Sequence, residues 1–320
     1  MRATSLDDAA ALIRHVRTTD IASAIADSTA EMVWIDIVRP TEDDGRFLRD
    51  TLKVHPLTVE DCLHGEQNPK LERYPGYYFL VIYAARINVE RRRPAFNELH
   101  CFVGPNFLVT VRHESMREVR ETMARWRSAP QHFASAGGMA HGLIDAIVDG
   151  YFPMVDHFSE RVAATESEAY EKPEDAMGHI MSLRRELLRF RGVVGPTRDT
   201  IGSLLRRDLP FLGPELLPYF QDVRDHIVRV TEEIDMLRDL LSTAVEAQFT
   251  VTSNQLNQTL RMMTAWSIIL MSMTLVAGIY GMNFILMPEL DWRYGYPFAL
   301  VFMLGIGATL VLYFKRRRWL

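Results

Sequence analysis

One side of the segment 257–281 combines neutral oxygen atoms with small side chains. Steps of three and four residues keep to one side of an α-helix, and from Asn257 they define a set that we call the polar face. Its members are Asn257, Leu260, Thr264, Ser267, Met271, Thr274, Gly278 and Gly281. Ile268, Ile269, Leu275 and Val276 fall elsewhere on the helix. The polar face predicts either close helix packing or the lining of a water-filled pore, and the spacing favours neither.

The tripeptide Gly281-Met282-Asn283 closes this segment with residues that could capture a hydrated cation. Mg²⁺ requires octahedral oxygen coordination and loses its waters reluctantly. A ring of Asn283 amides and Gly281 carbonyls can accept hydrogen bonds from those waters without the tight binding of carboxylates, so the ion can leave again. Gly and Asn also suit the end of a helix, and the two roles are compatible.

Two long stretches without charge must position these side chains. Residues 262–288 and 294–314 contain no Asp, Glu, Lys or Arg, and each is long enough to cross a bilayer, which takes about 20 apolar residues. The alternative is a pair of buried core helices, but such stretches are uncommon in soluble domains. One hairpin cannot enclose a water-filled path. A pore lined by the polar face therefore requires an oligomer, most simply a ring.

A basic cluster directly follows the second stretch and indicates its orientation. The cluster consists of Lys315, Arg316, Arg317 and Arg318. Basic residues favour the cytoplasmic side, so the connecting loop is expected outside and both termini inside. Cys62 and Cys101 agree with a reducing compartment, because they form neither a disulfide framework nor a zinc-site spacing. We expect an integral protein of the cytoplasmic (inner) membrane.

Charge is divided unevenly along the chain. Residues 261–320 hold six of the 36 basic and two of the 41 acidic residues, which leaves 30 basic and 39 acidic residues in 1–260. A nucleic-acid surface needs a clustered excess of Lys and Arg, so we expect no nucleic-acid partner. Divalent cations are more plausible partners. The sequence shows no nucleotide loop, catalytic triad or cofactor fingerprint, so we expect no enzyme.

Strand-like runs and helical stretches occupy different parts of the chain. Strands are predicted at 32–38, 77–87, 96–103 and 107–112, short helices at 41–53 and 56–64, and longer helices at 143–170, at 174–207 and from 215 into the membrane. The fold class is an α+β membrane protein with an N-terminal mixed α/β domain, a long helical stalk and two C-terminal transmembrane helices.

The same patterns suggest seven segments. We expect a cytoplasmic α/β domain over 1–136, a helical hairpin over 137–213, a stalk helix over 214–261, a first transmembrane helix with the pore over 262–283, an external loop over 284–293, a second transmembrane helix over 294–314 and a basic cytoplasmic tail over 315–320.

Several motifs together resemble the CorA family of divalent-cation channels and transporters. They are Ala277–Phe284, Met287–Leu290, Tyr294–Pro297, Tyr219–His226, Leu143–Asp149 and His55–Asp61. The resemblance covers most of the chain and thins before about residue 30. It implies a homopentamer in the lipid membrane, with a funnel-shaped cytoplasmic domain, a stalk helix and a central pore. It also implies Mg²⁺ as the transported and regulatory ion, with no other cofactor.

Individual residues then take expected roles along the pore. Thr274 and Asn257 would offer rings of oxygen, and Met271 would form an apolar constriction able to dewet and close. The resemblance places Met271 and Leu260 at the family's hydrophobic gate. Glu289 would form an external ring that attracts cations, or it is an ordinary solvated carboxylate.

The resemblance also places a regulatory Mg²⁺ ligand at Asp222, at a subunit interface. Its acidic partner is not evident, because residues 88–93 preserve no obvious acidic pair. Asp145 and Asp149 are secondary candidates, and each acid taken alone could be a solvated helix charge. Three functions compete: a Mg²⁺ uptake channel, a Zn²⁺, Co²⁺ or Ni²⁺ transporter of the same fold, and a membrane-anchored sensor or scaffold that carries no ions.

Overall fold

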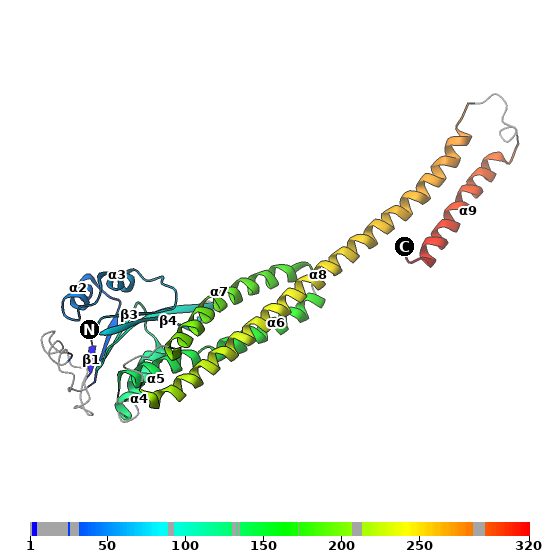
Figure 1. Ribbon diagram of the computed structural model, residues 1–320. Coiled ribbons are helices and arrows are strands. Elements are labelled where there is room, and N and C mark those ends of the chain that lie inside the picture. Colours follow the sequence, from blue (N-terminus) through cyan, green and yellow to red (C-terminus); the bar gives the residue numbers. More distant parts are fainter. Residues whose placement is uncertain are drawn as a thin grey trace. The chain divides into compact units, whose positions relative to one another are not determined.

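A computed structural model gives the fold of the chain (Figure 1). It describes residues 2–4, 25, 32–88, 93–129, 133, 135–171, 173–206, 213–283 and 292–320. The chain divides into two compact units, Met1–Thr243 and Ala244–Leu320. This division falls inside the predicted stalk segment, and the seven segment boundaries stay predictions.

The first unit contains a six-stranded mixed sheet in the order β1-β2-β6-β5-β4-β3. Its strands are β1 (Arg2–Thr4), β2 (Val33–Val38), β3 (Lys70–Tyr74), β4 (Tyr77–Asn88), β5 (Arg93–Val103) and β6 (Phe107–Arg112). β2 and β6 are parallel, with Val33 opposite Phe107, and all other neighbours are antiparallel. The four predicted strands are confirmed, whereas β1 and β3 were not predicted.

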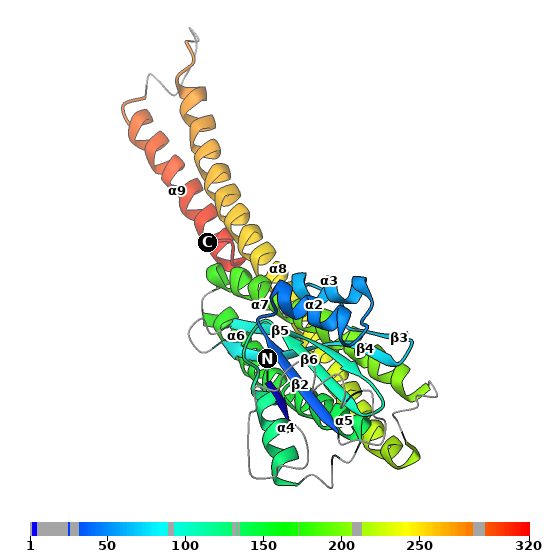
Figure 2. The ribbon, with the colours of Figure 1, turned by 90° about the vertical axis from the view of Figure 1, so that its left-hand side faces the viewer.

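Helices cover both faces of this sheet. Side chains alternate between the two faces of a strand, so each face carries apolar side chains that pack against helices. On one face, Ile35, Phe79 and Val109 join a buried cluster with Phe47 and Val59 of the short helices α2 (Glu42–Asp50) and α3 (Pro56–His64). On the other face, Trp34 packs against Trp126 of α4 (Arg117–Ser128), with ring centroids 6.0 Å apart. Figure 2 shows α2 and α3 away from α4 and α5 (Ala136–Asp149) across the sheet.

Long helices complete the first unit and continue beyond it. They are α6 (Phe152–Glu171), α7 (Pro173–Arg206) and α8 (Leu217–Tyr280). A short 3₁₀ turn, Pro214–Leu216, directly precedes α8. The predicted helical stretch over 143–170 consists of two helices, because α5 ends at Asp149 and α6 begins at Phe152. Pro153 favours the first turn of a new helix, since it lacks a backbone N–H.

The second unit consists of the C-terminal part of α8 and of α9 (Gly295–Arg316). Both helices are long and apolar enough to cross a membrane. α8 runs without interruption from Leu217 to Tyr280, as the absence of Gly and Pro between Pro218 and Gly278 predicts. The predicted fold class is thereby confirmed: an N-terminal α/β region, a long helix and two C-terminal helices of membrane length.

A buried ion pair joins the two parallel strands. The Arg112 guanidinium on β6 donates to both carboxylate oxygens of Asp36 on β2, at 3.0 and 2.7 Å. The two side chains are only 6% and 5% exposed. Thr110 donates to the same carboxylate at 2.9 Å, so its oxygens are well supplied with donors. Such a pair tolerates loss of one partner poorly, because the other charge is left buried.

We therefore expect Arg112→Ala to lower the free energy of unfolding by about 3–5 kcal/mol. The exposed pair between Arg86 and Glu114, with side chains 49% and 62% exposed, is the control. Arg86→Ala should cost less than about 1 kcal/mol. Urea unfolding of the full-length protein in detergent measures both losses of free energy. The signal is the tryptophan fluorescence, to which Trp34 contributes. Equal losses in the two variants would contradict the prediction.

Candidate functional site

The contact between α8 and α9 uses one side of α8. Ala265 and Ile269 of α8 are buried with Phe314 of α9, and Met273 packs against them. Val276 is also buried, at 8% exposure. An α-helix turns by about 100° per residue. The buried side of α8 therefore lies roughly opposite the polar face.

The polar face is accordingly exposed along its length in the second unit. Met271 is 74% and Leu260 is 51% exposed, and Asn257, Thr264, Ser267, Thr274, Gly278 and Gly281 are exposed as well. Leu275, on the flank of this face, is 65% exposed. The polar face is thus not used for packing within the hairpin. Two of the predicted roles are left for this face: close packing against a helix of another chain, and the lining of a water-filled pore.

The hydroxyl groups of the polar face are held by their own helix. Thr264, Ser267 and Thr274 each donate to the backbone carbonyl four residues earlier, at 2.7, 2.8 and 2.9 Å. A carbonyl can only accept a hydrogen bond, so the hydrogen of each hydroxyl points to the helix backbone. Its oxygen then presents lone pairs away from the helix, which suits hydrogen bonds from the waters of a cation.

The end of α8 lies at the predicted tripeptide. The Gly281 N–H donates to the Ala277 carbonyl at 2.9 Å, and the Met282 N–H donates to the Ile279 carbonyl at 3.3 Å. Gly281, Met282 and Asn283 are all exposed. The last carbonyls of a helix lack helical partners, and this end of the helix carries partial negative charge. Both features favour a cation beside Asn283. Glu289 lies outside the described residues.

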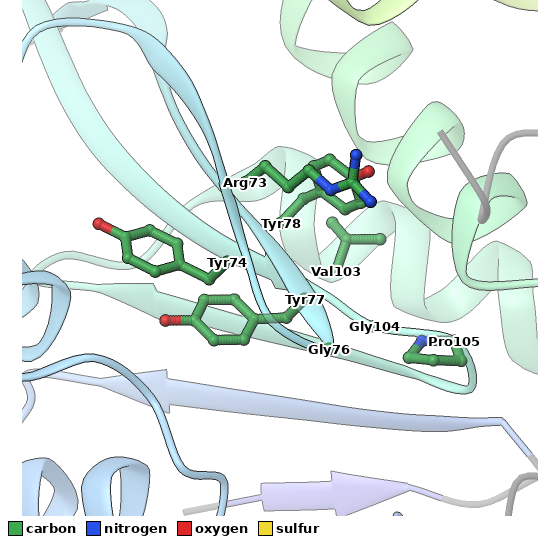
Figure 3. A pocket seen from close by; sticks show the side chains of 8 residues that line it. All are labelled: Arg73, Tyr74, Gly76, Tyr77, Tyr78, Val103, Gly104 and Pro105. Atoms are coloured by element: carbon green, nitrogen blue, oxygen red, sulfur yellow. The ribbon is translucent and has the colours of Figure 1, made fainter. Parts of the chain in front are cut away.

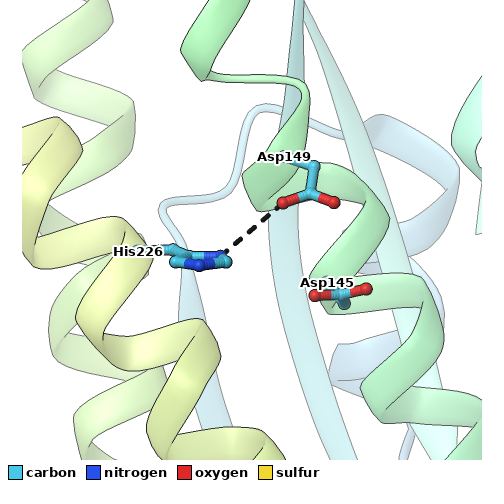
Figure 4. Close-up of side chains that lie close together, drawn as sticks. All are labelled: Asp145, Asp149 and His226. Carbon is cyan, nitrogen blue, oxygen red and sulfur yellow. Dashed lines mark ion pairs between the residues drawn. The ribbon is translucent and has the colours of Figure 1, made fainter.

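The predicted regulatory acids come together in the first unit. Asp145 and Asp149 lie on α5, one turn apart, and face His226 of α8 (Figure 4). Ligand atoms of these three residues lie within 4.8 Å of one another, a spacing that could hold a metal ion. The His226 ring lies between two carboxylates, with Nδ1 3.7 Å from Asp149 Oδ1 and Nε2 3.8 Å from Asp222 Oδ2.

Electrostatics of this cluster favour a bound cation. Burial raises the pKa of Asp145, and the nearby Asp149 carboxylate raises it further. The distances from His226 to its carboxylates are too long for direct hydrogen bonds. A divalent cation at the cluster would relieve the repulsion between the acids. His226 was not among the predicted metal ligands, although its spacing of four residues from Asp222 places both on one side of α8.

A separate pocket lies at the end of the sheet (Figure 3). Its cavity of about 220 Å³ is lined by Arg73, Tyr74, Gly76, Tyr77, Tyr78, Val103, Gly104 and Pro105. The rings of Tyr74 and Tyr77 stack with centroids 5.1 Å apart. The lining has no carboxylate, so it does not resemble a site for Mg²⁺. None of the predicted site residues lies in this pocket.

Known proteins resemble the chain over most of its length. The sequence profile of the CorA-like Mg²⁺ transporter protein family matches residues 29–316. The cobalt/magnesium transport protein CorA of Thermotoga maritima is 31% identical over 96% of this chain and 89% of its own length. The putative metal ion transporter YfjQ of Bacillus subtilis is 32% identical over 89% of each chain.

Solved structures share the fold. The CorA magnesium transporter of Methanocaldococcus jannaschii superposes with a TM-score of 0.78 at 18% identity, over 90% of this chain and 92% of the other. The full-length CmaX protein gives a TM-score of 0.73 at 18% identity, over 100% of this chain and 98% of the other. Both likenesses concern the fold.

Cysteine labelling tests the assignment of sides on α8. In the membrane-reconstituted protein, cysteines at Met271 and Thr274 should react with a small water-soluble thiol reagent. Cysteines at Ile269 and Val276 should react many times more slowly, because both positions are buried. Burial raises the pKa of both native thiols, Cys62 and Cys101, so they provide little background reaction. Equal rates at the introduced positions would reject a water-filled path along this face.

Proposed function

Because the chain belongs to the family of CorA-like Mg²⁺ transporter proteins, which transport divalent cations, we propose that it carries Mg²⁺ into the cytoplasm through a homopentameric pore. The observation that carries this proposal is the polar face of α8. It lies opposite the contact with α9 and leads to Gly281, Met282 and Asn283 at the helix end. We propose transport alone, without an enzymatic activity.

The oxygen chemistry of this path supports Mg²⁺. Its side-chain donors are the hydroxyls of Thr264, Ser267 and Thr274 and the amides of Asn257 and Asn283. It contains no Cys or His, the ligands that Zn²⁺ and Ni²⁺ favour. Neutral oxygens can hold the hydrated ion by its waters and release it again. Co²⁺ is the main alternative, since the Thermotoga maritima relative is a cobalt/magnesium transport protein.

An oligomer is part of the proposal because two helices cannot enclose a pore. A ring of subunits would bring one polar face from each chain to a common axis. There Met271 and Leu260, both strongly exposed in the single chain, would form apolar constrictions. Rings of Asn257 and Thr274 would supply oxygens on the outer sides of these two constrictions, before Leu260 and after Met271 along the helix. The count of five subunits, and the cation-attracting ring of Glu289, rest on the resemblance to the family and on the sequence.

The orientation follows from the charges at the ends of α9. Lys315 and Arg316 lie in its last turn, with Arg317 and Arg318 directly after it. Basic residues favour the cytoplasmic side of the inner membrane. With two spans, the α/β region would then also be cytoplasmic. Divalent ions captured beside Asn283 would enter from outside, and the four basic residues would form a ring at the inner end.

Regulation by internal Mg²⁺ is proposed for the acidic cluster. Asp222, 67% exposed, could bridge to a neighbouring subunit, while Asp145, Asp149 and His226 supply further ligands on its own chain. Asp222 lies on α8, the helix that also carries the polar face. Mg²⁺ can close the pore only if it binds the closed arrangement better than the open one. Low Mg²⁺ would leave like charges unrelieved and favour opening.

Asn283→Ala should lower Mg²⁺ flux into proteoliposomes at least about tenfold. Loss of one hydrogen bond to a charged partner is worth about 1.5–3 kcal/mol, and a factor of ten needs about 1.4. Ser272→Ala is the matched control, because its hydroxyl binds the Ile268 carbonyl at 2.7 Å and lies in the groove beside α9. Wild-type flux in a correctly assembled Asn283→Ala protein would remove Asn283 from the filter. Comparing Mg²⁺, Co²⁺, Ni²⁺ and Zn²⁺ in the same assay tests the ion.

Asp222→Ala should conduct at internal Mg²⁺ concentrations that close the wild type. It should also lose part of the protection that Mg²⁺ gives the cytoplasmic region against proteolysis. Asp225→Ala removes the same charge from an exposed position of α8 outside the cluster, and should behave as the wild type. Unchanged inhibition in Asp222→Ala would move regulation elsewhere, with Asp145 and Asp149 the next positions to test.

A further inference from the structure

The basic residues after α9 belong to a folded helix cap. The Arg318 N–H donates to the Lys315 carbonyl at 3.1 Å, and the Trp319 N–H donates to the Phe314 carbonyl at 3.0 Å. This pair of hydrogen bonds defines a Schellman cap. The Trp319 ring stacks on the Phe314 ring with centroids 5.4 Å apart, and it packs against the buried cluster of the helix pair. The cap holds the neighbouring cations at the end of the hairpin.

Arg318 occupies the position of this cap that normally takes glycine. Its φ of +56° lies in the left-handed region, which a side chain with a Cβ adopts only at a cost. Glycine would form the same two hydrogen bonds without strain. The geometry of the cap therefore does not explain why residue 318 is an arginine. The property of Arg318 that glycine lacks and that could explain it is the positive charge. Arg39, Lys53 and Glu66 also have positive φ, so the φ of Arg318 points to a function only together with its charge and position.

The four cations of residues 315–318 have little counter-charge in their own unit. All four side chains are exposed. In residues 244–320 the acids are Glu246, Glu289 and Asp291, and the last two precede α9 at its far end. The negative end of the helix dipole offsets only part of the repulsion. Arg317 also lies over the Tyr313 ring, 5.8 Å from its centroid, an arrangement that leaves its N–H groups available.

We propose that residues 315–318 bind the phosphate group of an anionic phospholipid, a partner site beyond the transport function. Guanidinium groups match phosphate with paired hydrogen bonds. Phe314 and Trp319 set the depth, because tryptophan favours the membrane interface, where lipid phosphates lie. Basic clusters directly after a transmembrane helix attract anionic lipids. Free phosphate offers the same chemistry, but this depth at the bilayer boundary makes lipid the occupant.

Quenching of Trp319 by brominated lipid tests this site without measuring ion flux. The full-length protein is reconstituted in phosphatidylcholine vesicles that contain a small, equal fraction of either brominated phosphatidylglycerol or brominated phosphatidylcholine. The signal of Trp319 is isolated as the difference from Trp319→Phe. We expect stronger quenching by phosphatidylglycerol. Equal quenching by the two lipids, or loss of the preference when inorganic phosphate is added, would overturn the proposal.

Variants distinguish the effect of the charges of residues 315–318 from the effect of the helix cap. Each arginine changed to glutamine should lower the preference about fivefold at low salt, and the triple variant Arg316→Gln, Arg317→Gln, Arg318→Gln should lose it. Arg293→Gln, at the other end of α9, should keep it. Arg318→Gly should lose as much preference as Arg318→Gln yet unfold at a higher temperature. A preference retained in Arg318→Gly or in the triple variant would overturn the proposal.

Discussion

The oxygen-bearing side of α8 is poorly suited to face lipid. Hydrocarbon offers no hydrogen bonds, so polar side chains inside a membrane face protein or water. Within the hairpin, α9 covers the side of α8 that carries Ala265 and Ile269, and the polar face is left on the opposite side. A chain built this way is suited to an assembly in which further subunits complete its membrane part. The proposed pore follows from this requirement, because a ring brings the uncovered faces together around water.

Charge is used differently in the two units of the protein. In the first unit, Asp145, Asp149 and Asp222 surround one histidine, an arrangement that a divalent cation would stabilise. In the second unit, the basic residues 315–318 stand at the end of a folded cap with little negative charge nearby. The polar face of α8 carries neutral oxygens. Neutral donors there are consistent with transport, since strong binding along the path would slow release.

Several elements were predictable because their residues carry strong local patterns. The strands at 33–38 and 107–112 are mainly apolar, interrupted by Asp36, Thr110 and Arg112, and α8 has no Gly or Pro between Pro218 and Gly278. β3 was missed because Lys70–Tyr74 is a charged edge strand without alternation, as edge strands commonly are. The break between α5 and α6 was also missed, although Gly150 and Pro153 signal it.

The sequence by itself determined the kind of protein: two apolar spans, a polar face with a period of three and four residues, and a tripeptide suited to a hydrated cation. These are properties of neighbouring residues along one helix, and helical geometry makes them readable without a fold. Only the tertiary structure decided which side of α8 meets α9, and that Asp145 and Asp149 of α5 lie beside His226 of α8. Contacts between residues distant in sequence depend on how whole helices pack, which no local pattern specifies.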